Sequence, residues 1–158
     1  MNYINLNSSQ KTHMEMDFIN KDRKKIHQSW FAENTVDYWR HSRMYDTIER
    51  FANFYKDLRW LTIGDGRFGL DSIRLRKKFE IKSIFPTDIS ESFLKYSKDK
   101  GFIDNYGVEN AEALSFEDNS FDIVFTKESM HHWPRPYLGI YEMLRVAAKA
   151  VILIEPFD

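Results

Sequence analysis

The sequence predicts an α/β fold, a doubly wound parallel sheet with helices on both faces, preceded by an N-terminal helical cap. Two observations carry this prediction. From Arg59 onward, short apolar stretches alternate with helix-prone stretches, and the first apolar stretch runs straight into a glycine-rich turn. Alternation of this kind builds a parallel sheet, whose ligands bind at the carboxyl ends of the strands.

This alternating part predicts about five strands and three helices. Gly101 suits the residue that follows the second helix, and Pro134 or Pro136 suits the first turn of the third. The strands are expected near 59–63, 82–87, 105–108, 121–126 and 150–155, and the helices near 69–79, 90–100 and 135–148.

The N-terminal part is predicted as two segments. Residues 1–15 are polar and expected to be disordered, whereas residues 16–58 are helix-prone and rich in aromatic side chains. The helices there would either form a plain layer on the sheet or act as a lid over a ligand. Residues 59–158 would form the ligand-binding core of what is a single domain overall.

The glycine-rich turn is the first candidate for a binding site. Gly64, Gly66 and Gly69 fit the pattern G-x-G-x-x-G, in which missing Cβ atoms allow a tight turn and close approach of a ligand to the backbone. The same glycines would also suit a plain connection between a strand and a helix.

An acidic residue ends the second predicted strand. Asp88 follows the glycine turn by about the 20 residues at which a nucleoside-binding α/β fold places a carboxylate for the ribose hydroxyls. Alternatively, Asp88 caps the helix that begins near Ser90.

Four segments resemble, in order and spacing, the motifs of class I S-adenosylmethionine-dependent methyltransferases. They are Gly64-Asp-Gly-Arg-Phe-Gly, Thr87-Asp-Ile-Ser, Asn110-Ala-Glu-Ala-Leu-Ser-Phe and Asn119-Ser-Phe-Asp-Ile-Val-Phe. The resemblance covers residues 59–156 and is strongest to the small-molecule branch typified by the ubiquinone and menaquinone C-methyltransferases. It implies a Rossmann-like sheet of order 3-2-1-4-5, S-adenosylmethionine as cofactor, S-adenosylhomocysteine as product, and a small-molecule methyl acceptor.

The resemblance also implies which residues hold the cofactor. The glycine turn would pass beneath the methionine part, Asp88 would hold the ribose, and the segment from Asn110 would surround the adenine, with Ile89 or Leu114 covering the ring. An arginine fork would bind the methionine carboxylate, Arg43 being the first choice and Arg40 the second. The cofactor-binding residues expected are Gly64, Asp65, Gly66, Asp88, Ile89, Asn110, Ala111, Glu112, Lys127, Arg43 and Tyr38.

Two positions depart from the family pattern. Thr62 stands where many relatives have an acidic residue, and Phe68 stands where they have a third glycine. Gly69 would take over the role of that glycine. A hydroxyl orients a loop amide more weakly than a carboxylate does, so the expected consequence is weaker cofactor binding with the fold intact.

His131 and His132, in the loop after the fourth strand, are the candidate catalytic residues. Imidazole titrates near neutral pH and can accept a proton from the methyl acceptor. The alternative is that the pair packs against the cofactor or caps a helix. No metal site is expected, because adjacent histidines point in different directions and no third ligand is evident.

The last predicted strand, Val151-Ile-Leu-Ile, would be an exposed apolar edge, because relatives continue with a helix and a closing β-hairpin. A homodimer through this edge, or cover by the N-terminal segment, is expected. The short end also favours an alternative function, a non-catalytic or truncated cofactor-binding scaffold of the same fold. A nicotinamide oxidoreductase is a more distant alternative.

Composition excludes several kinds of site and partner. The chain has 158 residues, 42% of them hydrophobic, no cysteine and a net charge of −1. Disulfides and thiolate metal sites are therefore excluded, and without a long basic run a nucleic-acid partner is not expected. Neither a membrane span nor a signal peptide is recognisable, so a cytoplasmic location is expected.

Overall fold

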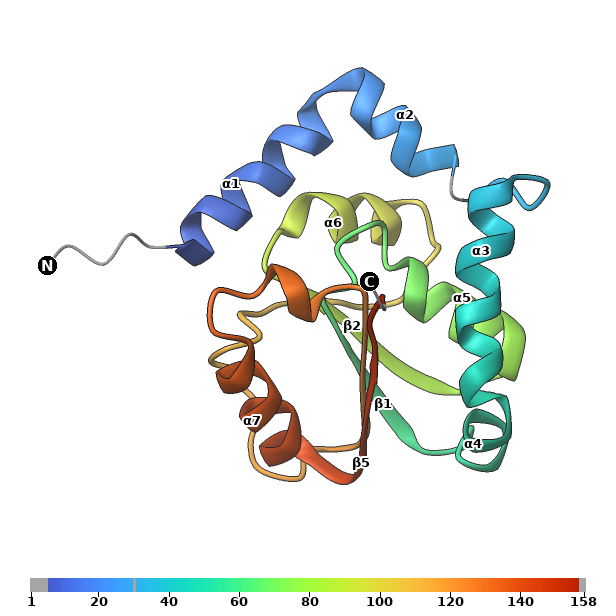
Figure 1. Cartoon of the computed structure of the whole chain (residues 1–158), viewed down its shortest axis with the longest axis vertical. Coiled ribbons are helices and arrows are strands. Elements are labelled where there is room, and N and C mark those ends of the chain that lie inside the picture. The colour runs from blue at the N-terminus through green and yellow to red at the C-terminus, as the bar shows by residue number, and fades with distance from the viewer. Residues whose placement is uncertain (1–5, 30, 157–158) are drawn as a thin grey trace, which may run out of the picture.

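The computed structural model describes residues 6–29 and 31–156, and a parallel sheet lies at its centre (Figure 1). The sheet has five strands in the order β3-β2-β1-β4-β5. The predicted fold class and strand order are confirmed. The strands are β1 (Arg59–Ile63), β2 (Ser83–Asp88), β3 (Gly107–Val108), β4 (Phe121–Lys127) and β5 (Ala147–Ile154). The helices are α1 (Leu6–Ile19), α2 (Lys21–Ser29), α3 (Val36–Met44), η1 (Tyr45–Ile48), α4 (Glu49–Phe54), α5 (Leu70–Phe79), α6 (Glu91–Asp99), η2 (Met130–His132) and α7 (Pro136–Val146).

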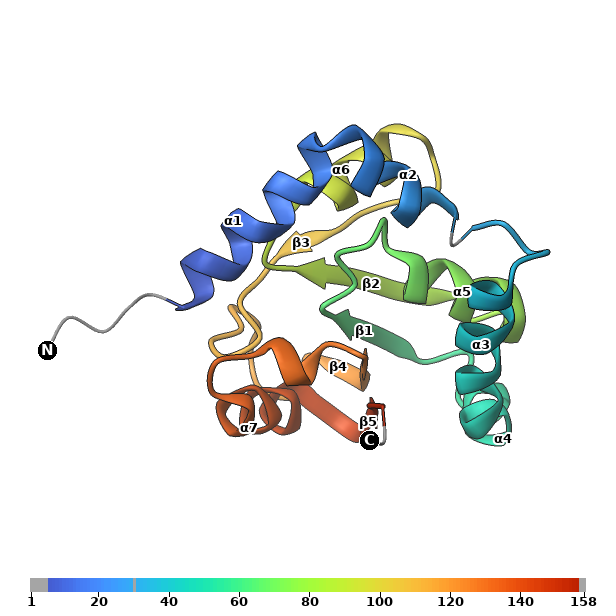
Figure 2. The same cartoon turned by 45° about the horizontal axis from the view of Figure 1, so that its top comes forward.

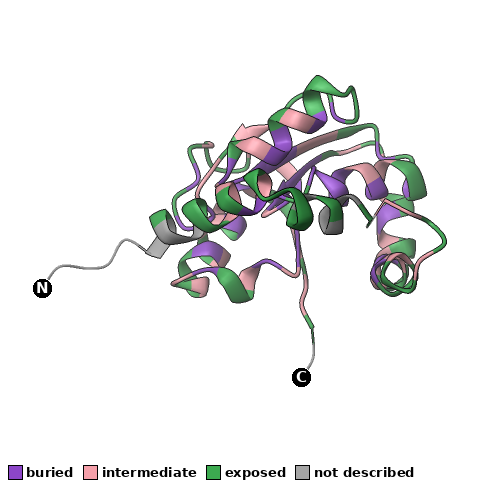
Figure 3. Ribbon diagram, turned by 90° about the horizontal axis from the view of Figure 1, so that it is seen from above, coloured by how far each residue is buried: buried purple, intermediate pink, exposed green. Residues whose placement is uncertain are grey.

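Strand β1 is buried on both faces and divides the core into two clusters. Trp60 packs with Leu75 of α5 on one face, whereas Leu61 packs with Met143 of α7 on the other. Figure 2 shows the same division, with α3, α4 and α5 on one side of the sheet and α7 on the other. Buried residues follow the strands and the inner helix faces (Figure 3). Alternating side chains of a parallel strand point to opposite faces, so a sheet covered on both sides needs such continuous apolar strands.

Local signals end and begin the helices as predicted. Gly101, with φ +73°, follows the last residues of α6, and its N–H donates to Lys98 O. Pro136 is the first residue of α7. The helices described in the structure include none that is both long and apolar enough to cross a bilayer.

The N-terminal segment differs from the prediction. Residues 6–15, expected to be disordered, belong to helix α1, whereas residues 1–5 lie outside the described part of the chain. Helix α1 lies along α6: the Phe18 and Phe93 rings meet edge to face at 5.0 Å, and Glu15 accepts a hydrogen bond from Ser90 Oγ at 2.7 Å. These contacts join residues about 75 positions apart, so the sequence of α1 alone gave no sign of its order.

Candidate functional site

A cavity of about 390 Å³ lies at the carboxyl ends of β1, β2 and β4, where the sequence predicts a ligand. Its floor and walls come from the turn after β1, the end of β2, the segment after β3 and the loop after β4, and its remaining wall comes from α1, α3 and the start of α5. The predicted residues that line it are Gly64, Asp65, Gly66, Asp88, Ile89, Asn110, Ala111, Glu112, Lys127 and His132.

The glycine turn runs so close to its neighbours that side chains are excluded. A Cβ on Gly64, where φ is +74°, would overlap the Ser129 side chain, and a Cβ on Gly66 would overlap the carboxylate of Asp88. Further along the turn, Phe68 and Gly69 both have positive φ, +65° and +66°. Phe68 therefore adopts the left-handed conformation itself, and its fully buried ring, packed on Phe93, offsets the strain.

Asp88 fits both interpretations of its position. Its Oδ1 accepts the N–H of Ser90 at 2.8 Å, so it orders the start of α6, and the same buried carboxylate lines the cavity opposite Gly66. Burial raises the pKa of Asp88 to about 6. A buried carboxylate of this kind is stabilised by donors that a ligand brings, such as sugar hydroxyls.

The segment after β3 is braced against the loop before α7. Asn110 Oδ1 accepts the N–H of Glu112, and the Glu112 carboxylate accepts from Arg135 Nε and Nη2 at 2.9 and 2.8 Å. The Glu112 side chain is only 1% exposed, so its charge is neutralised by Arg135 within the protein. The same segment also presents the apolar side chain of Ala111 to the cavity. Leu114 lies in the core and does not line the cavity, whereas Ile89 does.

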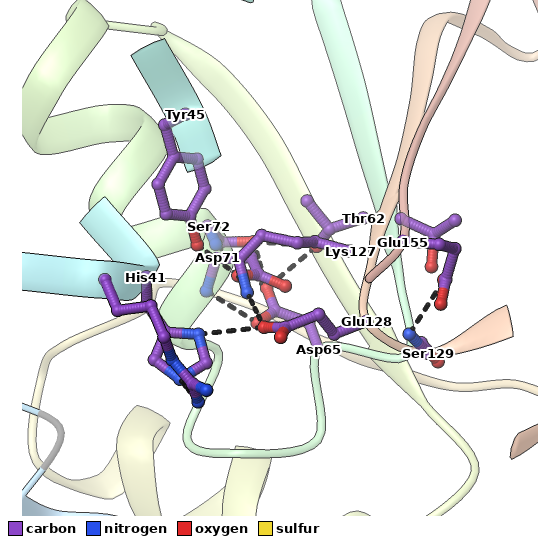
Figure 4. Close-up of polar contacts among 12 residues, drawn as sticks. His41, Tyr45, Thr62, Asp65, Asp71, Ser72, Lys127, Glu128, Ser129 and Glu155 are labelled. Carbon is purple, nitrogen blue, oxygen red and sulfur yellow. Dashed lines mark hydrogen bonds and ion pairs between the residues drawn. The ribbon is translucent and has the colours of Figure 1, made fainter. Parts of the chain in front are cut away.

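Asp65 is the centre of a buried polar network beneath the turn (Figure 4). Its carboxylate accepts hydrogen bonds from Thr62 Oγ1, from the N–H of Asp71, and from both the N–H and the hydroxyl of Ser72. Burial and the neighbouring charge of Asp71 raise the pKa of Asp65 to about 7. The side chain therefore fixes the start of α5.

A second part of the network ties the helical cap to the loop after β4. Tyr45 donates to Asp71, and Lys127 Nζ lies 2.6 Å from Glu128, whose other partner is His41 Nδ1 at 2.8 Å (Figure 4). Burial would raise the pKa of Glu128, but the hydrogen bonds from His41 and Lys127 outweigh it and bring this pKa to about 2. Glu128 has a φ of +49°, a rare conformation that turns its side chain toward His41.

Comparison with known proteins decides the family. Residues 61–154 match the family model described as a methyltransferase domain. The chain belongs to this methyltransferase family. It is 28% identical over 113 residues to phosphoethanolamine N-methyltransferase 2 of Caenorhabditis elegans, covering 66% of this chain and 25% of that protein.

Solved structures share the fold of this methyltransferase domain. The YcgJ protein of Bacillus subtilis superposes with a TM-score of 0.62 at 21% identity, over 73% of this chain and 51% of that one. The trans-methyltransferase CalH, solved in complex with S-adenosylhomocysteine, gives 0.54 at 22% identity, over 64% and 32% of the two chains. The chain thus spans a quarter to a half of the length of these relatives.

Two cap residues expected at the site of the methyltransferase domain lie elsewhere. The Arg43 guanidinium lies 5.1 Å from the Trp39 ring, and the Tyr38 ring faces the Arg74 guanidinium at 4.9 Å. Neither lines the cavity, and neither does Arg40. His41 of the same helix and Arg74 of α5 line it instead.

Sequence reasoning missed several other cavity residues. The helical spacing of Tyr38, His41 and Tyr45 marks one face of the cap, and this signal points to His41. The residues from α1 carried no such signal. The missed lining residues include His13, Met14, Asp17, His41, Arg67, Arg74, Ser129 and Trp133.

The two histidines after β4 have different surroundings. His132 lines the cavity, whereas His131 does not and pairs with Glu155 instead, 2.6 Å from Nδ1 to Oε2. Burial, then the proximity of His131 and Arg67, lowers the pKa of His132, so the neutral imidazole is favoured. In the part of the chain that the structure describes, no three histidine or carboxylate side chains are arranged to hold a metal ion.

Proposed function

We propose that this chain is the cofactor-binding core of an S-adenosylmethionine-dependent methyltransferase that acts on a small molecule. The observation that carries the proposal is the placement of Asp88, a buried carboxylate at the end of β2, against the Gly64–Gly66 turn at the edge of one cavity. On one side of the cavity the glycines leave the backbone open to a ligand, and on the other side the Asp88 carboxylate can accept hydrogen bonds from ribose hydroxyls. This pair of features suits a nucleoside with an extended tail.

The residues present fit the parts of this cofactor. Asp88 would accept from the ribose hydroxyls, and Ile89 and Ala111 would contact the adenine. The methionine end would run past Gly64 toward Lys127 and Arg74, which carry the positive charges a carboxylate needs in place of Arg43.

When bound, S-adenosylmethionine supplies an already activated methyl group on its sulfonium. The protein then has to align the acceptor, exclude water and remove a proton. We assign proton removal to His132, because it lines the cavity and the lowered pKa keeps its imidazole ready to accept. Helix α1, with His13 and Met14 on the cavity wall, would exclude water.

The size of the cavity suits a small-molecule cofactor. A volume of about 390 Å³ is within the range of small-molecule sites, roughly 300–1,000 Å³. The name of the Caenorhabditis elegans relative makes the amine of phosphoethanolamine the first acceptor to test. The resemblance to the quinone branch makes a quinone precursor the second.

Calorimetry with S-adenosylmethionine, S-adenosylhomocysteine and NAD tests the cofactor assignment. We expect both adenosyl compounds to bind and NAD not to bind, and bound ligand should raise the melting temperature by mass action. Binding of NAD alone would point to an oxidoreductase, and no binding at millimolar ligand to folded protein would reject the assignment. Cofactor binding without methylation of any acceptor tested would favour the non-catalytic scaffold. In that case His132→Ala should leave cofactor affinity unchanged and have no methylation rate to lower.

A further inference from the structure

Glu155, the residue after β5, reaches across to the loop after β4. One carboxylate oxygen accepts the N–H groups of Ser129 and Met130 at 3.1 and 2.8 Å, and the other lies 2.6 Å from His131 Nδ1. Figure 4 shows the first of these contacts. The Glu155 side chain is 17% exposed, so these are its main surroundings. A single carboxylate thus holds three consecutive residues.

The loop that Glu155 holds carries four cavity residues, Glu128, Ser129, His132 and Trp133. Trp133 Nε1 donates to Ser129 Oγ at 3.2 Å, so these two are fixed to each other as well. The rings of His131 and His132 are tilted against one another with centroids 4.0 Å apart. The His131 ring that Glu155 holds therefore packs against the His132 ring.

We propose that Glu155 is a positioning residue, which orients the loop after β4 through its contacts with Ser129, Met130 and His131 and places a negative charge near His132. The inference rests on the proposed function, in which His132 accepts the proton. Glu155 does not line the cavity, so it acts on the loop and not on a ligand.

The charges around His132 predict in which direction its pKa changes when the Glu155 charge is removed. Besides burial, the groups that lower the pKa of His132 are His131 on its own loop, Arg67 on the glycine turn and His13 on α1, whereas Glu155 raises it. Removing the Glu155 charge leaves only the lowering influences. The pKa of His132 should then fall further.

Glu155→Gln separates charge from shape, since the amide oxygen still accepts from Ser129 and Met130. We expect the NMR titration midpoint of the His132 ring proton to fall by roughly 0.5 pH unit, the size of a partly screened unit charge. Asp122→Asn is the matched control: Asp122 also accepts a backbone N–H, from Arg59 at 3.0 Å, and pairs with Lys149, but at the other end of β4. That variant should leave His132 unchanged.

Glu155→Leu removes the acceptor as well, and should speed amide hydrogen exchange at Ser129 and Met130, with circular dichroism confirming the fold. An unchanged His132 titration in Glu155→Gln would overturn the proposal. This readout needs no cofactor, so it stands even if wild-type protein fails to bind S-adenosylhomocysteine. With an active acceptor, the acidic limb of the rate profile should move to lower pH in Glu155→Gln and stay in place in Asp122→Asn.

Discussion

Thr62 donates a hydrogen bond to the buried carboxylate of Asp65, with 2.9 Å between Oγ1 and Oδ2. The resemblance to the methyltransferase family implies an acid at the position of Thr62. The chain therefore keeps a carboxylate in contact with this position but supplies it from the glycine turn. Asp65, not Thr62, orders the N–H groups of Asp71 and Ser72, and the expected weakening of cofactor binding stays a prediction.

Restoring the family acid should therefore destabilise this protein. In Thr62→Asp a second buried carboxylate would face Asp65, close to Asp71, and we expect the free energy of unfolding to fall by roughly 3 kcal/mol at neutral pH. Urea unfolding measures this. Thr62→Ser keeps the hydroxyl and should stay within about 1 kcal/mol of wild type. Recovery of stability in Thr62→Asp combined with Asp65→Ser would identify Asp65 as the competing charge, whereas a stable Thr62→Asp protein would contradict this explanation.

Gly66 should be needed for space and not for backbone freedom. A Cβ there would overlap the Asp88 carboxylate, so Gly66→Ala should displace Asp88 and weaken S-adenosylhomocysteine binding by about tenfold or more. Calorimetry measures the affinity. Gly101→Ala is the control: its φ of +73° makes the variant strained by about 1 kcal/mol, but nothing lies within 4 Å of the new Cβ. Gly101→Ala should lose stability and keep affinity, and equal affinity in both variants would argue against a cradle at Gly66.

Much of the core was predictable from sequence because its signals are local. The strands are short apolar runs between turn residues, and Gly101 and Pro136 act on the helix ends beside them. Helix α1 was missed because its order depends on contacts such as Glu15 with Ser90, which sequence periodicity does not reveal.

The motif residues were likewise placed at one cavity, because the carboxyl ends of parallel strands share an edge. The cap residues Arg43 and Tyr38 were not placed correctly from the sequence, because the face that α3 turns to the cavity depends on packing. Tyr45 and Tyr38 lie against the Arg74 guanidinium, and this arrangement sets the rotation of α3 that brings His41 to the cavity and leaves Arg43 outside.

Binding of S-adenosylhomocysteine should depend on pH through Asp88. Its pKa is raised from 3.8 to about 6, so below pH 6 the protonated carboxyl loses acceptor capacity and affinity should fall, by up to roughly tenfold per pH unit. Asp88→Asn should bind on the order of 10- to 100-fold more weakly at pH 7.5 and lack this dependence on pH.

For folding without ligand the pH dependence has the opposite sign. The stability that Asp88 contributes is full below pH 3.8 and is lost as pH rises through about 6. Calorimetry from pH 5 to 8 measures the pH dependence of S-adenosylhomocysteine affinity. A wild-type affinity that does not change over this range would contradict the ribose role of Asp88.

Strand β5 forms one edge of the sheet, and its outward backbone groups can be identified. The N–H of Glu128, the residue directly after β4, donates to Ile154 O, so Ile154 and the alternate residues before it point their backbone groups toward β4. Leu153 and Val151 therefore point theirs outward. The Val151 and Ile152 side chains pack on the two core clusters, so a charge at either would unfold the protein and would not test association.

Leu153 offers a cleaner test of the dimer that we expect through this edge. Its side chain is 39% exposed and its N–H points away from β4, so Leu153→Pro removes one edge donor without breaking the β4 ladder. If two copies pair through β5, wild-type protein should sediment as a concentration-dependent dimer and Leu153→Pro should shift toward monomer, with Leu153→Ala as the control that keeps the N–H. An unpaired apolar edge invites such pairing because it presents a row of free donors and acceptors. Wild-type protein that stays monomeric at high concentration would show that a second copy does not cover β5.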